Sequence, residues 1–202
     1  MMDQHSQTAL IIFVRNPVLG KVKTRLAKTI GDEKALIVYQ LLLNHTHKCT
    51  VELPCRKFVY YADAIDEYDL WNSPGYTKRI QQGNDLGDRM KNAFKDLFDQ
   101  GFKKVGIIGS DCLQLNPDLI SAALASLDEY DVVIGPATDG GYYFLGMRFL
   151  IPELFQDKNW STSTVYKETI EEVNKLKLRS HLLVTLCDID KEADLRQSNI
   201  EI

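Results

Sequence analysis

The chain alternates short apolar runs with amphipathic stretches, and this alternation constrains its fold more than any other feature. Residues 9–14 and 105–108 are apolar runs of the kind that form strands buried on both faces of a sheet. Residues 86–98 instead place apolar side chains at helical spacing. Strands that alternate with helices are typical of a mostly parallel sheet with helices on both faces. We therefore expect an α/β protein with three α/β/α layers and a mostly parallel, mixed sheet, formed by residues 1–202 as a single domain.

The same patterns predict the individual elements. The expected strands cover residues 9–14, 58–61, 78–82, 105–108, 132–134, 142–147 and 182–186. The expected helices are one capped by Asp32 that runs through Leu42, and those over residues 86–98, 117–127 and 165–176. The strand over residues 142–147 follows its predecessor too closely for a helical crossover. It is therefore expected to pair antiparallel or to join an edge of the sheet.

Composition and charge narrow the class of protein. The 202 residues are 45% hydrophobic, which suffices for a sizeable core, and no apolar run approaches the roughly 18 residues of a membrane helix. The polar stretch from Met1 to Thr8 lacks a signal-peptide pattern, so we expect a short flexible lead-in (residues 1–8) to a cytoplasmic protein. A net charge of −4 argues against a general nucleic-acid binder. The four cysteines form no C-x-x-C pair, which argues against a zinc site.

Aspartates follow three of the expected strands. Asp111 follows the fourth strand, Asp139 the fifth, and Asp188 and Asp190 the seventh. A single aspartate in such a place is more often a cap or a turn residue, but ligands of open α/β sheets bind where the carboxyl ends of the strands meet. Carboxylates gathered there would repel one another without a cation, and Mg²⁺ or Mn²⁺ prefers oxygen ligands. The pattern therefore predicts a divalent-metal site.

The first expected strand ends in a loop of the opposite charge. This loop carries four basic residues around a proline and a glycine: Arg15, Lys21, Lys23, Arg25, Pro17 and Gly20. Lysine and arginine donate charge-assisted hydrogen bonds to phosphate oxygens, and N–H groups at a helix start favour anions. The loop has neither the Walker A pattern nor a G-x-G-x-x-G fingerprint, which argues against an ATPase and a dinucleotide dehydrogenase. A basic loop that faces a metal-binding carboxylate cluster predicts a diphosphate site, because both would stabilise a departing diphosphate.

Longer strings of the sequence resemble one family. They are Phe13-Val-Arg-Asn-Pro-Val-Leu-Gly-Lys-Val-Lys-Thr-Arg-Leu26, Gln82-Gly-Asn-Asp-Leu-Gly-Asp-Arg-Met90, Gly109-Ser-Asp-Cys112, Gly135-Pro-Ala-Thr-Asp-Gly-Gly-Tyr-Tyr143, Trp160-Ser-Thr-Ser-Thr-Val165 and Asp188-Ile-Asp-Lys-Glu-Ala-Asp-Leu195. Together they span nearly the whole chain and resemble the DUF2064 family of glycosyltransferase-like bacterial proteins. The family usually has proline after its Gly-Ser-Asp-Cys string, where this chain has Leu113. The resemblance implies the nucleotide-diphospho-sugar transferase (GT-A) fold and a transferase.

The resemblance also implies binding roles for particular residues. Those implied to grip the donor phosphates are Arg15, Gly20, Lys23 and Arg25. Those implied to line the nucleotide are Gln82, Leu86, Gly87 and Arg89. Gly140 and Gly141 are implied beside the transferred group, because glycine lets the backbone approach a ligand closely. Trp160 and Tyr142 are expected either to stack on a sugar or acceptor or to pack in the core.

Catalysis is implied at Asp111, Asp139 and Lys23. Asp111 is implied as the principal ligand of Mg²⁺ or Mn²⁺, with Asp190 as the second ligand. Asp139 is implied near the transferred group, either as a ligand or as a base. Asp194 is expected to start a helix rather than to take part in catalysis.

Three functions are open on these observations. The first is a glycosyltransferase that moves a sugar from a nucleotide-diphospho-sugar donor to an unknown acceptor. The second is a nucleotidyltransferase that joins a nucleoside triphosphate to a phosphorylated metabolite and releases pyrophosphate, which the strongly basic loop also suits. The third is a nucleotide-binding protein without catalysis. The donor base, the sugar, the acceptor and the oligomeric state stay open.

Overall fold

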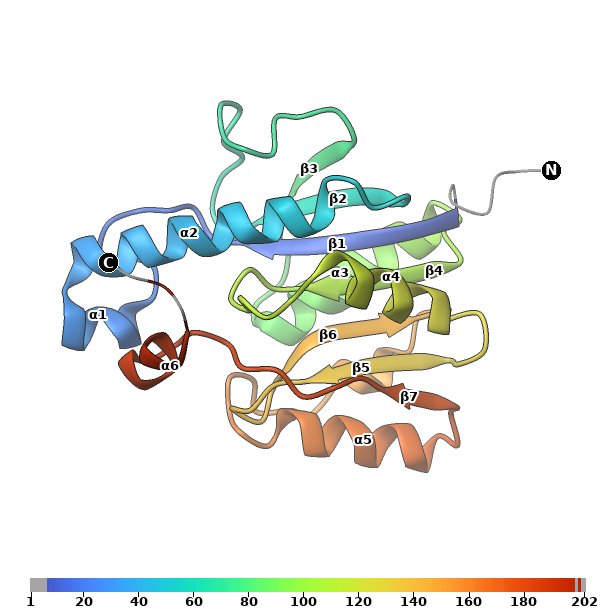
Figure 1. The fold of residues 1–202 in the computed structure, drawn as a ribbon. Helices are drawn as coiled ribbons and strands as arrows, with labels where there is room; N and C mark the ends of the chain where they lie inside the picture. Colours follow the sequence, from blue (N-terminus) through green and yellow to red (C-terminus); the bar gives the residue numbers. More distant parts are fainter. Residues whose placement is uncertain (1–6, 199, 201–202) are drawn as a thin grey trace.

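Seven strands form one sheet in the order β3-β2-β1-β4-β6-β5-β7 (Figure 1). This computed structural model describes residues 7–198 and 200. The strands are β1 (Thr8–Val14), β2 (Arg56–Tyr61), β3 (Tyr76–Ile80), β4 (Lys104–Ile108), β5 (Val132–Pro136), β6 (Tyr142–Met147) and β7 (Ser180–Leu182). Neighbours pair parallel except at β6, which runs antiparallel to both β4 and β5. The predicted α/β fold with a mixed, mostly parallel sheet is confirmed, and β6 lies inside the sheet rather than at an edge.

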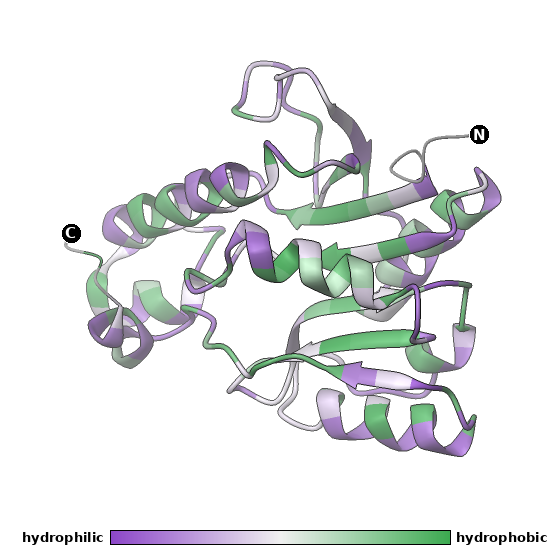
Figure 2. Ribbon diagram, turned by 45° about the vertical axis from the view of Figure 1, so that its right-hand side comes forward, coloured by the Kyte–Doolittle hydropathy of each residue, from purple (hydrophilic) through white to green (hydrophobic). Residues whose placement is uncertain are grey.

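Helices cover both faces of this sheet. They are α1 (Thr24–Ile30), α2 (Asp32–Thr50), α3 (Leu86–Asp99), α4 (Pro117–Ser126), α5 (Val165–Lys175), α6 (Glu192–Gln197) and a short 3-10 helix, η2 (Pro152–Phe155). Leu10 of β1 packs on one face with Tyr39 of α2 and Ile120 of α4, and Ile11 packs on the other face with Phe94 of α3. Figure 2 shows hydrophobic strands in the middle and helices of mixed character around them. Within residues 7–198 and 200, none of the helices combines the length and the apolar character that a membrane crossing needs.

Two helices begin next to the carboxyl edge of the sheet with side-chain caps. Before α3, Asp85 Oδ1 accepts a hydrogen bond from Asp88 N at 2.8 Å. Before α4, Asn116 Oδ1 accepts one from Leu119 N at 2.9 Å, and Pro117 takes the first turn. α1 and α6 lie beyond the same edge, at the left of Figure 1. The loops that carry the predicted site residues are therefore gathered at one end of the molecule.

The sequence patterns missed α1, indicated α6 only through the expectation that Asp194 starts a helix, and misplaced the start of α2. Gly31, with φ of 87°, is the N-cap of α2, and Asp32 is its first helical residue. α1 buries Leu26 and α6 buries Leu195 as their single buried residues, so neither shows the repeated apolar spacing that reveals a helix. Asp194 lies in the first turn of α6, as predicted.

Several strand boundaries also differ from the prediction, among them the start of β1, the end of β3 and the end of β7. Thr8 is the first residue of β1 and is buried, so the expected flexible lead-in does not reach it; residues 1–6 lie outside the described residues. β7 ends at Leu182 instead of covering residues 182–186. Beyond it the chain follows β5 irregularly, with one isolated bridge to Leu186, and its apolar Val184 is exposed.

The segment after β7 has a small core of its own beyond the sheet edge. Ile189 and Leu195 pack against Leu26 of α1 and against Val38 and Leu42 of α2. These residues join the C-terminal part of the chain to its first two helices. This contact is one of those that hold the segment between β7 and α6 in place.

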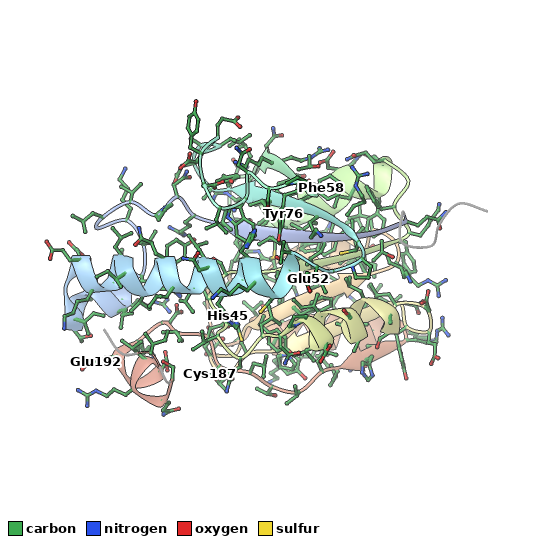
Figure 3. All side chains as sticks on the ribbon, turned by 45° about the horizontal axis from the view of Figure 1, so that its top comes forward. His45, Glu52, Phe58, Tyr76, Cys187 and Glu192 are labelled. Carbon is green, nitrogen blue, oxygen red and sulfur yellow. The ribbon has the colours of Figure 1, made fainter. Side chains whose placement is uncertain are left out.

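Backbone hydrogen bonds fasten the same segment to the loop after β4. Ile189 N donates to Asp111 O at 2.9 Å, and Cys187 N donates to Gln114 Oε1 at 2.8 Å. Figure 3 labels Cys187 and Glu192 along this segment. The chain between these two residues thus lies against the end of β4 and carries its aspartates to the same place.

Ile189→Ala should loosen the segment. Ile189 is 2% exposed, and truncation of a buried isoleucine to alanine costs about 2–5 kcal/mol. We expect a fall of that order in the free energy of unfolding, measured by urea denaturation. Val184→Ala is the control, because Val184 is 61% exposed and should change the free energy of unfolding by less than about 0.5 kcal/mol. Equal losses in the two variants would contradict the small core.

Candidate functional site

A cleft of about 660 Å³ opens at the carboxyl edge of the sheet. The predicted site residues that line it are Arg15, Lys23, Arg25, Leu86, Arg89, Asp111, Asp139, Gly141 and Asp190. Four other predicted residues are described but lie outside the lining: Gly20, Gln82, Gly87 and Gly140. The structure thus brings the basic loop and the carboxylates to one cleft, which is the arrangement that a diphosphate site requires.

The Lys23 side chain joins the first loop to two of the carboxylates. Its Nζ lies 2.8 Å from Asp111 Oδ1 and 3.0 Å from Asp190 Oδ1, and the side chain is 5% exposed. Lys23 has a left-handed backbone conformation, with φ of 46°, directly before α1. Such a conformation costs a residue other than glycine on the order of 1 kcal/mol, so the surrounding contacts must hold it. The two predicted metal ligands therefore share one ammonium group.

The charge of Lys23 is secure at neutral pH. Burial by itself lowers the pKa of its ammonium, because a charge is poorly solvated there. The carboxylates of Asp111 and Asp190 outweigh burial, and the pKa is raised above its ordinary value. Arg25 adds a weaker contact, with Nη1 3.8 Å from Asp190 Oδ2 and a largely exposed side chain. Lys23 is thus a permanent cation in this site and does not serve as a base.

Asp188 belongs to the same cluster, although it was not among the predicted site residues. Burial, followed by the charges of Asp111, Asp139 and Asp190, raises the pKa of its carboxyl to about 7, although Lys23 lowers it. The cluster therefore carries more negative charge than Lys23 neutralises.

Asp139 lies in the short loop between β5 and β6. Its Oδ1 accepts a hydrogen bond from Gly141 N at 2.8 Å. Gly140 has φ of 90°, and a Cβ at this position would stand 2.1 Å from the carbonyl oxygen of Ser163. Gly140 is therefore needed for packing between two loops, whereas Gly141 lines the cleft. Asp139 is thus held by its own loop and lines the cleft.

Tyr39 fastens the start of the basic loop to the end of β4. Its hydroxyl accepts a hydrogen bond from Arg15 N at 2.8 Å, donates one to Arg15 O at 3.1 Å, and lies 3.3 Å from Ser110 Oγ. Burial raises the pKa of Tyr39, so the hydroxyl keeps its proton. The Tyr39 side chain thus holds Ser110, which precedes Asp111, next to Arg15, the first residue of the basic loop.

Three predicted contact residues that lie outside the lining have structural roles in the protein. Gly20, with φ of 73°, allows the tight turn in the middle of the basic loop. A Cβ on Gly87 would stand 2.1 Å from Trp160 Nε1, so this glycine makes room for the indole ring. Gln82 offers its carbonyl oxygen to Asn92 Nδ2 at 2.8 Å. These three residues thus support loops and helices next to the cleft but do not line it.

Gln81 lines the cleft, whereas its neighbour Gln82, which the family resemblance implied at the nucleotide, lies outside the lining. Its Nε2 donates to Val14 O at 3.3 Å and to Tyr60 O at 3.0 Å. Because carbonyl oxygens only accept hydrogen bonds, they must face the donating nitrogen of the Gln81 amide, and this fixes the orientation of the side chain. Arg89, which lines the cleft as predicted, donates from Nε to the carbonyl oxygen of Gly83 at 3.3 Å.

Trp160 and Tyr142 pack in the core and also line the cleft. Trp160 stacks with Phe155 at a centroid distance of 6.5 Å, and burial raises the pKa of Tyr142, whose hydroxyl lies 3.9 Å from the sulfur of Met90. Both rings nevertheless line the cleft. They pack in the core with one side and give the cleft an apolar wall with the other.

The carboxylate cluster suits a hard divalent cation. Asp111, Asp139, Asp188 and Asp190 offer oxygen ligands with surplus negative charge, which Mg²⁺ and Mn²⁺ favour. In the part of the chain that the structure describes, no three carboxylate, thiolate or imidazole groups converge closely enough to hold an ion by themselves. Such ions are commonly held by one or two carboxylates together with substrate phosphates. The residues therefore fit a cation whose coordination is completed by a bound diphosphate.

The residues missed by the sequence prediction differ in whether a pattern could have revealed them. Asp188 stands two residues before Asp190, so the sequence alone could have placed it at the site. Tyr39 lies in a helix among core residues, and nothing in its spacing distinguishes it. Gln81 could be identified only from the end of β3, and strand ends are the least certain feature of a sequence pattern.

Three solved structures are similar to this chain. A candidate nucleotide-diphospho-sugar transferase from Desulfovibrio desulfuricans G20 is 34% identical, with a TM-score of 0.87 over 94% of this chain and 85% of that chain. The inositol-1-phosphate CTP transferase from T. maritima is 12% identical, with a TM-score of 0.56 over 94% and 91%. Rv0371c from Mycobacterium tuberculosis H37Rv, in complex with manganese, is 11% identical, with a TM-score of 0.52 over 95% and 97%. The last two likenesses concern the fold alone, and the predicted enzyme class agrees with the name of the 34% identical D. desulfuricans protein.

The family comparison rests on sequence. No protein of curated function matches the chain. Residues 45–162, more than half of the 202, match the family described as "Uncharacterized protein conserved in bacteria (DUF2064)". With the 34% identity to the D. desulfuricans protein over nearly the whole chain, the predicted family is confirmed: the chain belongs to the DUF2064 family.

Proposed function

We propose that the protein is a glycosyltransferase that moves a sugar from a nucleotide-diphospho-sugar donor to an acceptor with the help of Mg²⁺ or Mn²⁺. One observation carries the proposal: a basic loop and a carboxylate cluster meet in one cleft, joined by Lys23 between Asp111 and Asp190. The 34% identical protein from D. desulfuricans, a candidate transferase of this type, supports the donor class.

The basic loop would bind the donor diphosphate. Arg15 and Lys21 are exposed, line the cleft and, among the described residues, have no carboxylate within ion-pair distance. Their charges are therefore available for an anion, and a guanidinium group can bind phosphate oxygens in a bidentate manner. The nucleotide would extend from this loop toward Gln81 and Arg89 at the start of α3.

The carboxylates would act on the other side of the diphosphate. Asp111 and Asp190 would hold the cation, which when bound supplies positive charge to the departing nucleoside diphosphate. In the structure Lys23 neutralises these two carboxylates; a cation bound to them would take its place, and its ammonium could then bind the donor phosphates. Asp139, on the wall of the cleft, is placed to accept the proton of the attacking acceptor hydroxyl.

A nucleotidyltransferase is the second candidate. Arg15 and Lys21 leave enough unpaired positive charge for a triphosphate, and the fold is shared with the T. maritima CTP transferase. The two candidates differ in their products, because glycosyl transfer releases a nucleoside diphosphate and nucleotidyl transfer releases pyrophosphate.

Asp111→Asn should abolish metal-dependent turnover. The amide keeps the shape of the side chain but loses the charge that holds a cation, so we expect kcat/KM to fall roughly a hundredfold or more. Nucleoside diphosphate release from a panel of UDP-, GDP- and dTDP-sugars with Mn²⁺ measures this, beside pyrophosphate release from each nucleoside triphosphate with phosphorylated metabolites.

Asp128→Asn is the matched control, because Asp128 is exposed and pairs with Lys104 outside the cleft. It should leave turnover unchanged. If no donor of the panel yields nucleoside diphosphate in the unmodified protein, the glycosyltransferase proposal fails; pyrophosphate release would then establish the second candidate.

Lys23→Met should tighten the binding of Mn²⁺ in the absence of nucleotide. In the structure the Lys23 ammonium occupies both carboxylates that the ion needs, so its removal takes away a competitor. We expect a Kd for Mn²⁺ roughly tenfold lower by isothermal titration calorimetry, which corresponds to about 1.4 kcal/mol, together with weaker donor binding. Lys21→Met is the control, because Lys21 makes no ion pair with a described carboxylate. An unchanged or higher Kd in the Lys23 variant would rule out this competition.

Asp188→Asn should stabilise the protein more at pH 8 than at pH 5. The pKa of Asp188 rises from 3.8 to about 7 on folding, so the folded state binds the proton more tightly than the unfolded chain does. This contribution to stability is complete below about pH 4 and is lost as the pH rises through 7. Thermal melting at both pH values tests it, with the exposed Asp63→Asn as control. Identical shifts of Tm at the two pH values would show that Asp188 does not titrate in this range.

A further inference from the structure

A second hollow, of about 330 Å³, lies beside the cleft on the side of the C-terminal segment. Asp139, Ser161, Thr162, Asp188 and Asp190 belong to the walls of both. A molecule in the hollow and a donor in the cleft would therefore meet at these residues. The hollow is as small as the smallest ligand sites usually are, which suits a single ring or a short chain.

Hydroxyl groups form one wall of the hollow. They belong to Thr138, Ser161, Thr162 and Ser163. This wall is fixed: Thr162 Oγ1 donates to Asn159 O at 2.7 Å and lies 3.0 Å from Thr164 Oγ1. The close approach of Ser163 to Gly140 and the packing of Trp160 on Gly87 fasten it at both ends. The hydroxyls are therefore presented in a defined arrangement rather than on a free loop.

Charged groups form the remaining walls. Four are carboxylates, of Asp139, Asp188, Asp190 and Asp194, and two are bases, of Arg25 and Lys191. All of the described residues that line the hollow are thus polar, in contrast to the cleft, where Leu86, Tyr142 and Trp160 contribute apolar surface.

The chemistry of the walls selects the ligand. An apolar acceptor would find few apolar atoms on walls made of polar residues, and an anionic acceptor would meet more carboxylates than bases. A neutral compound with several hydroxyls can donate hydrogen bonds to the carboxylates and accept them from serine, threonine, Arg25 and Lys191. We propose that the hollow is the acceptor subsite and that it takes a small, uncharged, polyhydroxylated molecule, a sugar or a polyol. This inference rests on the proposed glycosyl transfer for its link to the reaction, but not for the binding itself.

Binding of neutral polyols is the test. D-mannose and myo-inositol, offered to the full chain with Mg²⁺ and followed by saturation-transfer NMR, should bind, whereas mannose 6-phosphate and 1-butanol should bind at least several-fold more weakly. The double variant Thr138→Val/Ser163→Ala removes two exposed hydroxyls of the wall and should lower polyol affinity roughly tenfold, as expected for two lost hydrogen bonds. Ser163→Leu, which fills the hollow, should lower it further.

Ser121→Ala is the control, because Ser121 is an exposed residue of α4 far from the hollow in sequence and outside its lining. It should leave polyol affinity unchanged, and thermal melting of every variant checks the fold. Three results would overturn the subsite, even if nucleoside diphosphate is released from a donor. They are no polyol binding, weaker binding of polyols than of the phosphorylated sugar, and equal polyol affinity in the double variant and the unmodified protein. Polyol binding that the double variant loses supports the subsite, and if no donor is turned over in the same preparation only the proposed function fails.

Discussion

The contact on which the site depends is the ammonium group of Lys23 between Asp111 and Asp190. It joins three parts of the chain: the loop after β1, the end of β4 and the segment before α6. A nearly buried ammonium without its carboxylates would be costly, and removing one partner of such a pair is more damaging than its net contribution suggests. The left-handed backbone of Lys23 and the small core around Ile189 are the structural conditions for this contact.

Charge is distributed unequally around that contact, and this inequality gives the cleft its chemical character. One wall has an exposed arginine and lysine, Arg15 and Lys21, with no carboxylate partner among the described residues, and the other has four aspartates, of which only Asp111 and Asp190 contact the Lys23 ammonium. Burial and the neighbouring carboxylates raise the pKa of Asp188. A diphosphate with a divalent cation has charge of the right sign for each wall. The position at the carboxyl edge of a doubly covered sheet is where ligands of such folds are expected.

Much of the fold could be predicted because most strands are buried on both faces. The apolar runs of β1, β4 and β6 are continuous, and their limits came within one residue of the structure. α1 and the extent of α6 could not be predicted, since each helix buries a single residue and leaves no apolar period. β7 was displaced because an apolar run continues past Leu182 without being buried.

The candidate site could be predicted by residue type but not by pairing. Aspartates after strands and a basic loop after β1 are visible in the sequence, so the two halves of the cleft were correctly brought together. Which anion each basic residue would face was not visible, because a lysine suits a carboxylate as well as a phosphate. Lys23 was assigned to phosphate and lies on two carboxylates. Gly87 and Gly140 have packing partners that only the three-dimensional arrangement reveals.

The separation of 167 residues between Lys23 and Asp190 has a consequence for biosynthesis. A ribosome adds about 5–20 residues per second, so on the order of ten seconds or more pass between the synthesis of the lysine and that of its second carboxylate. During this interval Lys23 can pair with Asp111 but not yet with Asp190, although the residues of all seven strands have been made before Asp190 is added. The second half of the ion pair therefore waits for the C-terminal segment, and a chain cut off before this segment would lack one wall of its cleft.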